Sequence, residues 1–176
     1  MKKLLLIIDY QKDFVDGTLG FPGAEMLDGP IAQKIAAYRA SGDDIAFTLD
    51  THGEDYLLTQ EGRKLPVAHC LRKTPGWTLY GQVGRARQPK DTVIEKPAFP
   101  SQELGLWLQG RGYEQVELVG LVSYICVISN AVIAKAALPE AEILVDARCT
   151  AGPDPQLHEN ALDVMENALQ ITVTNR

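Results

Sequence analysis

Cysteine is scarce in this chain. The 176 residues contain three cysteines, Cys70, Cys126 and Cys149, and their spacing forms no paired motif. An odd number of unpaired cysteines argues against a disulfide framework and favours free thiols in a reducing compartment. We therefore expect a cytoplasmic protein whose cysteines serve in packing or in chemistry.

A long apolar run is missing near the N-terminus. The run that is present, residues 4–8, is far shorter than a bilayer span or the apolar core of an export signal. We expect no membrane partner and no export of the chain.

Positive charge is in deficit. Lysine and arginine number 17 against 23 acidic residues, which gives a formal net charge of −6. No basic stripe with interleaved aromatic residues is present, so general binding of nucleic acid or anionic membranes is not expected.

Two common signatures of enzyme classes are also absent. The chain has no Walker A loop and no G-x-S-x-G elbow of a serine hydrolase. Residues 81–86, Gly-Gln-Val-Gly-Arg-Ala, superficially resemble a dinucleotide-binding fingerprint. They follow no predicted strand and have the wrong glycine spacing, so we reject that interpretation.

What the sequence does contain is an alternation of strand and helix patterns. It predicts strands at residues 3–9, 44–50, 92–95, 116–122, 142–145 and 171–174, and helices at 26–40, 101–109 (with Ser101 as N-cap), from Cys126 to 138, and 155–168. This alternation predicts an α/β fold with a six-stranded parallel sheet between two helical layers, a Rossmann-like three-layer architecture. The length fits one domain over residues 1–176. Residues 51–90 are polar and weakly periodic, and irregular stretches of that length are usually functional.

Cys126 has the most informative position. An apolar strand breaks at Gly120 and passes into a helix, which predicts Cys126 in the first helical turn at the edge where open α/β sheets bind ligands. A helix N-terminus favours a thiolate, and a thiolate is a nucleophile. The alternative is a buried cysteine that only packs.

Asp9 and Lys96 end two other predicted strands at the same edge. A carboxylate near a thiol can accept its proton and later return it to a leaving amine. A lysine pointing inward would keep that carboxylate ionised. The alternatives are a turn aspartate and a solvated lysine.

Asp50 and His52 are two residues apart at the end of the second strand, so their side chains share a face. His69 follows downstream, with Glu61 between. Carboxylate and imidazole ligands suit Zn²⁺ or another divalent transition metal, although loop histidines are often merely solvated. We interpret Cys70 as a packing residue and His158 as structural.

Four blocks together resemble one family: residues 6–14 (LIIDYQKDF), 48–52 (TLDTH), 65–76 (LPVAHCLRKTPG) and 120–127 (GLVSYICV). With Lys96 in the expected interval, the chain resembles the isochorismatase-like cysteine hydrolases over essentially its full length. Within them it is most similar to the nicotinamidase branch.

This resemblance implies a catalytic triad of Asp9, Lys96 and Cys126 and the strand order 3-2-1-4-5-6. It implies a cis peptide between Leu121 and Val122, and an oxyanion hole formed by the amides of Val122 and Cys126. Substrate contacts would fall on Phe14, Leu121 and Val122.

The metal set implied by the resemblance is Asp50, His52 and His69, with Glu61 as a further candidate and zinc as the expected metal. The implied activity is a metal-containing cysteine amidohydrolase that cleaves a small carboxamide through a thioester, with nicotinamide as the expected substrate. Members often form homo-oligomers, which we also expect here.

The chain departs from the family pattern at the substrate pocket. Ser123 and Tyr124 replace the usual Thr-Asp, and Leu65 or Lys64 replaces the aromatic residue that would sandwich a pyridine ring against Phe14. Trp77 is a candidate replacement for that aromatic residue. The substrate therefore stays open between nicotinamide and an N-carbamoyl, ureido or other small amide, and a non-enzymatic ligand-binding protein is a further alternative.

Overall fold

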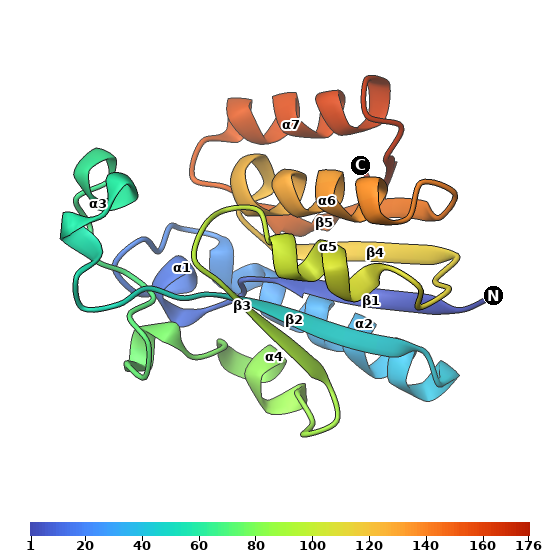
Figure 1. The fold of residues 1–176 in the computed structure, drawn as a ribbon, viewed down its shortest axis with the longest axis horizontal. Coiled ribbons are helices and arrows are strands. Elements are labelled where there is room, and N and C mark those ends of the chain that lie inside the picture. The colour runs from blue at the N-terminus through green and yellow to red at the C-terminus, as the bar shows by residue number, and fades with distance from the viewer.

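The computed structural model describes residues 1–176 and contains one sheet of six parallel strands (Figure 1). The strands are β1 (Lys3–Ile8), β2 (Asp44–Asp50), β3 (Thr92–Lys96), β4 (Gln115–Leu121), β5 (Glu142–Ala151) and β6 (Thr172–Thr174). Their spatial order is β3-β2-β1-β4-β5-β6, and every neighbouring pair is parallel. The predicted fold class and strand order are both confirmed.

Strand β1 lies at the centre of the sheet. Its side chains from Leu4 to Ile8 are all fully buried, which explains why its sequence is apolar without alternation. Leu4, Leu6 and Ile8 belong to one core, and Leu5 and Ile7 belong to the core on the other face.

Helices cover both faces of the sheet. In addition to short 3-10 turns, they are α1 (Lys12–Val15), α2 (Asp28–Ser41), α3 (Gln60–Lys64), α4 (Gly81–Ala86), α5 (Gln102–Leu108), α6 (Ile128–Ala137) and α7 (Pro155–Asn167). Helices α5, α6 and α7 lie on one face, and α2 and α4 lie on the other (Figure 1). The predicted N-cap of α5 is confirmed, because the Ser101 hydroxyl accepts a hydrogen bond from Leu104 N.

Strand β5 is longer than predicted. The sequence indicates an end at residue 145 because Asp146 and Arg148 follow, but the strand runs to Ala151. Asp146 is only 1% exposed, and Lys34 of α2 lies 2.7 Å from its carboxylate. An ion pair therefore allows a charged residue to occupy an interior position of the strand.

Residues 51–90 form short helical turns at the carboxyl edge of the sheet, where α3 stands out from the body (Figure 1). The buried side chain of Gln11 organises this segment. Its amide nitrogen donates to the carbonyls of Asp50 and Trp77, and its amide oxygen accepts from Asp50 N.

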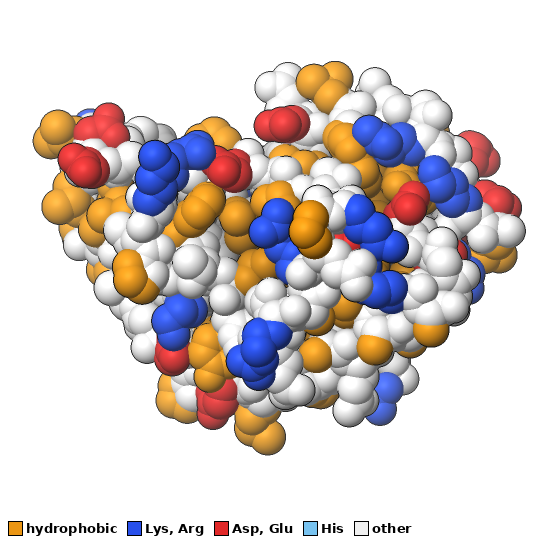
Figure 2. All heavy atoms as spheres, turned by 90° about the horizontal axis from the view of Figure 1, so that it is seen from below, with side chains coloured by type: hydrophobic (Ala, Val, Ile, Leu, Met, Phe, Trp, Pro, Cys, Tyr) orange, Lys and Arg blue, Asp and Glu red, His pale blue; other side chains and the backbone are white.

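On the face seen from the side of α4, lysine and arginine side chains are scattered among apolar and acidic ones rather than joined in a stripe (Figure 2). None of the helices is both long and apolar enough to cross a bilayer.

Candidate active site

Three polar side chains from different strands converge at the carboxyl edge of the sheet. Asp9 follows β1, Lys96 is the last residue of β3, and Cys126 lies in the turn after β4. Lys96 Nζ is 2.6 Å from Asp9 Oδ2 and 3.5 Å from Cys126 Sγ. All three side chains are at most 5% exposed, so their charges act on one another with little screening by water.

Asp9 is held on both carboxylate oxygens. Thr48 Oγ1 donates to Oδ1 at 2.6 Å, and Oδ2 forms the ion pair with Lys96 without a hydrogen bond of good geometry. Burial raises the pKa of Asp9, the charge of Lys96 lowers it, and the net pKa lies above the usual 3.8. This balance suits a group that must both accept and return a proton.

The sequence predicts Cys126 in the first turn of an α-helix, but the structure does not place it there. It lies in a π-helical turn, Ser123–Val127, that precedes α6. Burial and the negative charge of Asp9 raise the pKa of the thiol well above its usual value, while Lys96 opposes them. The group at rest is therefore a thiol beside a base, not the free thiolate expected from a helix N-terminus.

The peptide between Leu121 and Val122 is cis, which confirms the expectation drawn from the resemblance. The N–H group of Val122 donates to no acceptor within the chain, whereas its carbonyl accepts from both Ile125 N and Val127 N. The turn thus presents an unused amide donor four residues before the cysteine.

Asn130 is a residue that the sequence reasoning missed. Its fully buried side chain donates to the carbonyls of Cys126 at 2.8 Å and Phe99 at 2.9 Å, and accepts from Ser101 N at 3.0 Å. It joins the loop after Lys96 to the cysteine turn. An asparagine within an apolar helical pattern is the one signal that could have indicated such a role.

A second polar cluster borders the first. Asp50 Oδ2 lies 3.0 Å from His52 Nε2 and 3.3 Å from His69 Nε2, and the three donor atoms lie within 4.8 Å of one another. Two donors bonded at about 2 Å to one metal ion lie at most about 4 Å apart, and the 3.0 Å and 3.3 Å spacings from Asp50 to the two histidines satisfy this. A carboxylate with two imidazoles is the donor set expected for a divalent transition metal, so these residues fit one.

The surroundings of this cluster hold its members in place. His69 Nδ1 donates to the Val67 carbonyl at 2.8 Å, which leaves Nε2 facing Asp50. Burial raises the pKa of Asp50, but the hydrogen bonds from His52 and His69 and the charge of Lys96 together outweigh it and hold the pKa below its usual value, so Asp50 is ionised. Glu61 is more distant, with Oε1 3.7 Å from His52 Nε2 and 3.8 Å from His69 Nε2.

A cavity of about 230 Å³ opens between the two clusters. Apart from Asp50, His69 and Cys126, its wall is apolar and is made by Phe14, Leu19, Leu65, Phe99, Val122, Tyr124, Ile125 and Pro153.

The other sequence-predicted contacts are placed differently. Leu121 is fully buried in the core and is not part of the cavity wall. Trp77 donates from Nε1 to Thr51 Oγ1 and lines a separate open hollow near Arg85 and Glu95, so it does not replace the missing aromatic residue.

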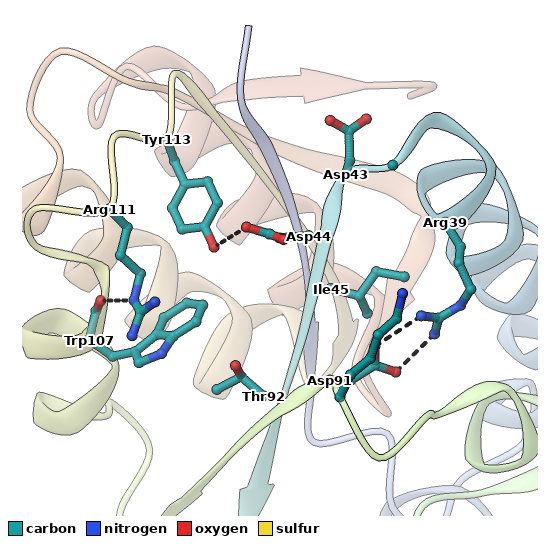
Figure 3. Close-up of a pocket in the computed structure, with 11 residues that line it drawn as sticks. Arg39, Asp43, Asp44, Ile45, Asp91, Thr92, Trp107, Arg111 and Tyr113 are labelled. Carbon is teal, nitrogen blue, oxygen red and sulfur yellow. Dashed lines mark hydrogen bonds and ion pairs between the residues drawn. The ribbon is translucent and has the colours of Figure 1, made fainter.

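The opposite edge of the sheet carries a different kind of hollow (Figure 3). Its polar groups are engaged with one another: Arg39 pairs with Asp91, and Tyr113 donates to Asp44 at 2.8 Å. Arg111 donates to the Trp107 carbonyl and lies over the Trp107 ring. The convergent thiol, carboxylate and imidazole groups are found at the carboxyl edge.

Comparison with known proteins agrees with this geometry. The isochorismatase domain model matches residues 3–176. The uncharacterized isochorismatase family protein PncA of Bacillus subtilis (strain 168) is 33% identical over 144 residues, which cover 75% of this chain and 78% of that protein. The crystal structure of nicotinamidase/pyrazinamidase PncA from Bacillus subtilis has a TM-score of 0.87 and 30% identity, covering 98% of this chain and 99% of that chain. N-carbamoylsarcosine amidase from Thermoplasma acidophilum has a TM-score of 0.81 and 26% identity, covering 98% and 95%.

The fold and the site define a hydrolase built on a parallel α/β sheet. The chain belongs to the isochorismatase family.

Proposed function

We propose that this protein is a cysteine amidohydrolase that cleaves a small carboxamide through a thioester, with nicotinamide as its first candidate substrate. One observation carries the proposal: a buried thiol and a buried carboxylate both lie within 3.5 Å of the Lys96 ammonium nitrogen, beside an apolar cavity. Such a set can create a nucleophile and manage its proton away from water.

In the first half of the reaction, the Cys126 thiol passes its proton to Asp9, and the sulfur attacks the amide carbonyl carbon. A C–S bond forms while the carbonyl π electrons move to oxygen, where the amides of Val122 and Cys126 stabilise the negative charge. The C–N bond then breaks, and Asp9 gives its proton to the departing nitrogen, which leaves as ammonia.

In the second half, Asp9 takes a proton from water, and the resulting hydroxide attacks the thioester carbonyl. The C–S bond breaks, the carboxylic acid leaves, and the proton on Asp9 restores the thiol. Lys96 remains charged throughout because the carboxylates around it raise its pKa although burial lowers it. Its charge keeps Asp9 ionised when a proton must be accepted.

Asp50, His52 and His69 would hold a divalent metal, with Glu61 as a candidate further ligand and zinc as the metal we expect. When bound, such an ion supplies a Lewis-acid site that can orient a substrate atom such as a pyridine nitrogen. The chain's own contribution is the apolar wall, in which Phe14 provides an aromatic face against a planar ring.

A second candidate is an amidase for an N-carbamoyl or ureido compound. Leu65 lines the same cavity as Phe14. By the family resemblance, the position of Leu65 or Lys64 would hold an aromatic partner that sandwiches a pyridine ring against Phe14. A leucine at this position does not select for a planar ring, and the chain is similar to an N-carbamoylsarcosine amidase.

Ammonia release tests both candidates. Purified protein with Zn²⁺ is given nicotinamide or N-carbamoylsarcosine, with Cys126→Ala as the control. Release from nicotinamide that disappears in Cys126→Ala supports a nicotinamidase, and release from the carbamoyl compound alone supports the second candidate. Equal release by Cys126→Ala would refute the cysteine mechanism.

Metal content tests the Asp50 cluster. We expect His52→Ala and His69→Ala to lose the metal that the parent protein retains after dialysis, because each removes one of three donors. His158→Ala is the matched control, since the His158 ring contacts Ser123 and lies outside the cluster. Unchanged metal content in both donor variants would contradict the assignment.

A further inference from the structure

The turn that carries Cys126 has no side-chain cap of its own. Val122, at its N-cap position, contributes no side-chain hydrogen bond to the turn, and the turn precedes α6 directly. Its orientation nevertheless fixes two amide groups, those of Val122 and Cys126, that our proposed mechanism directs at the substrate oxygen. Something outside the turn must therefore hold it against rotation.

Ser123 provides one such attachment. It follows Val122, is completely buried, and places Oγ 2.9 Å from Nδ1 of His158 on α7. His158 is the only hydrogen-bond partner of this hydroxyl in the structure. Burial lowers the pKa of His158 below its usual value, so the neutral ring is the form that meets the serine near neutral pH.

Tyr124 provides a second attachment to the same end of α7. Its hydroxyl accepts a hydrogen bond from Asp154 N at 3.3 Å, and Asp154 caps α7 through the amides of Gln156 and Leu157. The Tyr124 ring lies so close to Gly152 that a Cβ there would be 2.3 Å from a ring carbon. The chain between β5 and α7 is therefore shaped around the cysteine turn.

These contacts place the start of α7 beside the catalytic segment, at the carboxyl edge of the sheet (Figure 1). We propose that His158 is a positioning residue: through Ser123, it holds the turn so that the Val122 and Cys126 amides face the developing oxyanion. This inference rests on the amidohydrolase function proposed above. It gives a catalytic consequence to a histidine that the sequence presents as merely structural.

The consequence should appear in kcat rather than in KM. The negative charge on oxygen develops only in the transition state, so a misaligned donor costs little in substrate binding. A displacement of an ångström at a reacting centre can cost a factor of about a hundred in rate. The part of the cavity wall that lies outside the turn, which includes Phe14, Leu65 and Phe99, is left in place by changes at His158.

The test compares His158→Ala, Ser123→Ala, the double variant and the rescue variant His158→Asn. Asparagine can place a polar atom near the position of His Nδ1. The control is Asn160→Ala, because the Asn160 side chain bonds only to Gln156 of its own helix. With whichever amide the parent protein hydrolyses, we expect each single variant to lower kcat by roughly ten- to a hundred-fold with little change in KM. The double variant should lose no more than either single one, and His158→Asn should recover most of the rate.

Unchanged kcat in the single variants, or losses that multiply in the double variant, would overturn the inference. Hydrogen exchange at the Ile125 and Val127 amides supplies a readout that needs no substrate, because both donate to the Val122 carbonyl within the turn. We expect faster exchange in His158→Ala and Ser123→Ala but not in Asn160→Ala. An inactive parent protein would defeat the proposed function alone, whereas unchanged exchange in the variants would defeat the positioning role.

Discussion

Lys96 is the residue on which the site's electrostatics depend. It is 1% exposed, yet it carries a charge that faces Asp9, Asp50 and Cys126. This burial is tolerated because the attraction of two carboxylates offsets part of the hydration energy that the lysine charge loses. The same arrangement links the group around Cys126 to the candidate metal ligands, because Asp50 belongs to both. Asp50 contacts Lys96 through Oδ1 and contacts His52 and His69 through Oδ2.

Replacing Lys96 by methionine should move the acidic limb of the pH–rate profile to higher pH. Burial already raises the pKa of Asp9, and the lysine is the group that opposes it. Without that charge the pKa of Asp9 rises further, so a higher pH is needed to obtain the base form. We expect kcat near neutral pH to fall by about a hundred-fold or more.

Metal content must be measured in parallel, because Asp50 also loses its contact with Lys96. A Lys96→Met variant that keeps its metal and the parent pH profile would contradict the role assigned to the lysine.

At the scale of elements, the cysteine turn depends on neighbours that the sequence does not mark. The apolar patterns of β1 and β4 predict those strands because burial on both faces demands continuous apolar residues. The extent of β5 and the π-helical turn could not be predicted. The extent of β5 depends on Lys34, which is distant in sequence from Asp146. The turn is tied through Asn130, which donates to the Cys126 carbonyl, to the Phe99 carbonyl, which is distant in sequence.

Replacing Asn130 by alanine should destabilise the fold by about 2 kcal/mol or more, because it leaves buried backbone groups of Cys126 and Ser101 without partners and frees the Phe99 carbonyl. Urea unfolding measures the change. The matched control, Asn160→Ala on the exposed face of α7, should stay within about 0.5 kcal/mol of the parent protein. Equal stability of the two variants would show that the Asn130 bonds do not brace the loop.

For the molecule as a whole, the parallel sheet explains how distant residues meet. Strands that run in one direction end at a common edge, so Asp9, Asp50 and Lys96 converge although their strands are separated in sequence. The predicted strand ends already placed Asp9 and Lys96 at this edge, whereas their grouping with Cys126 as a catalytic triad comes from the family resemblance and stays a prediction. The cavity wall was less predictable: Leu65 and Tyr124 reach it from irregular segments, and Trp77 points elsewhere.

The same sheet is tied to α2 by a charged cluster, which makes stability depend on pH. Lys34 lies 2.7 Å from both Glu117 of β4 and Asp146 of β5. Burial raises the pKa of Asp146, but Lys34 lowers it below the usual 3.8 overall. The stability from this carboxylate is therefore present above pH 3.8 and is lost as the pH falls through its folded-state pKa.

Lys34→Met should cost about 3 kcal/mol of unfolding free energy near neutral pH, because it leaves two carboxylates unpaired. The difference from the parent protein should shrink as the pH falls below 3.8 and through the lowered folded-state pKa of Asp146, below which the carboxylate is protonated in both proteins. Urea unfolding at neutral and acidic pH measures both values. A difference that stays constant with pH would assign the loss to packing instead of charge.

The central claim is that Cys126 becomes acylated during turnover. Intact-mass and peptide analysis of the protein, quenched in acid during turnover of the amide it hydrolyses, tests this directly. We predict a mass increase equal to the acyl group, located on Cys126, sensitive to hydroxylamine and absent from Cys126→Ala. Turnover with the acyl group on another residue, or turnover by Cys126→Ala at the parent rate, would contradict the account.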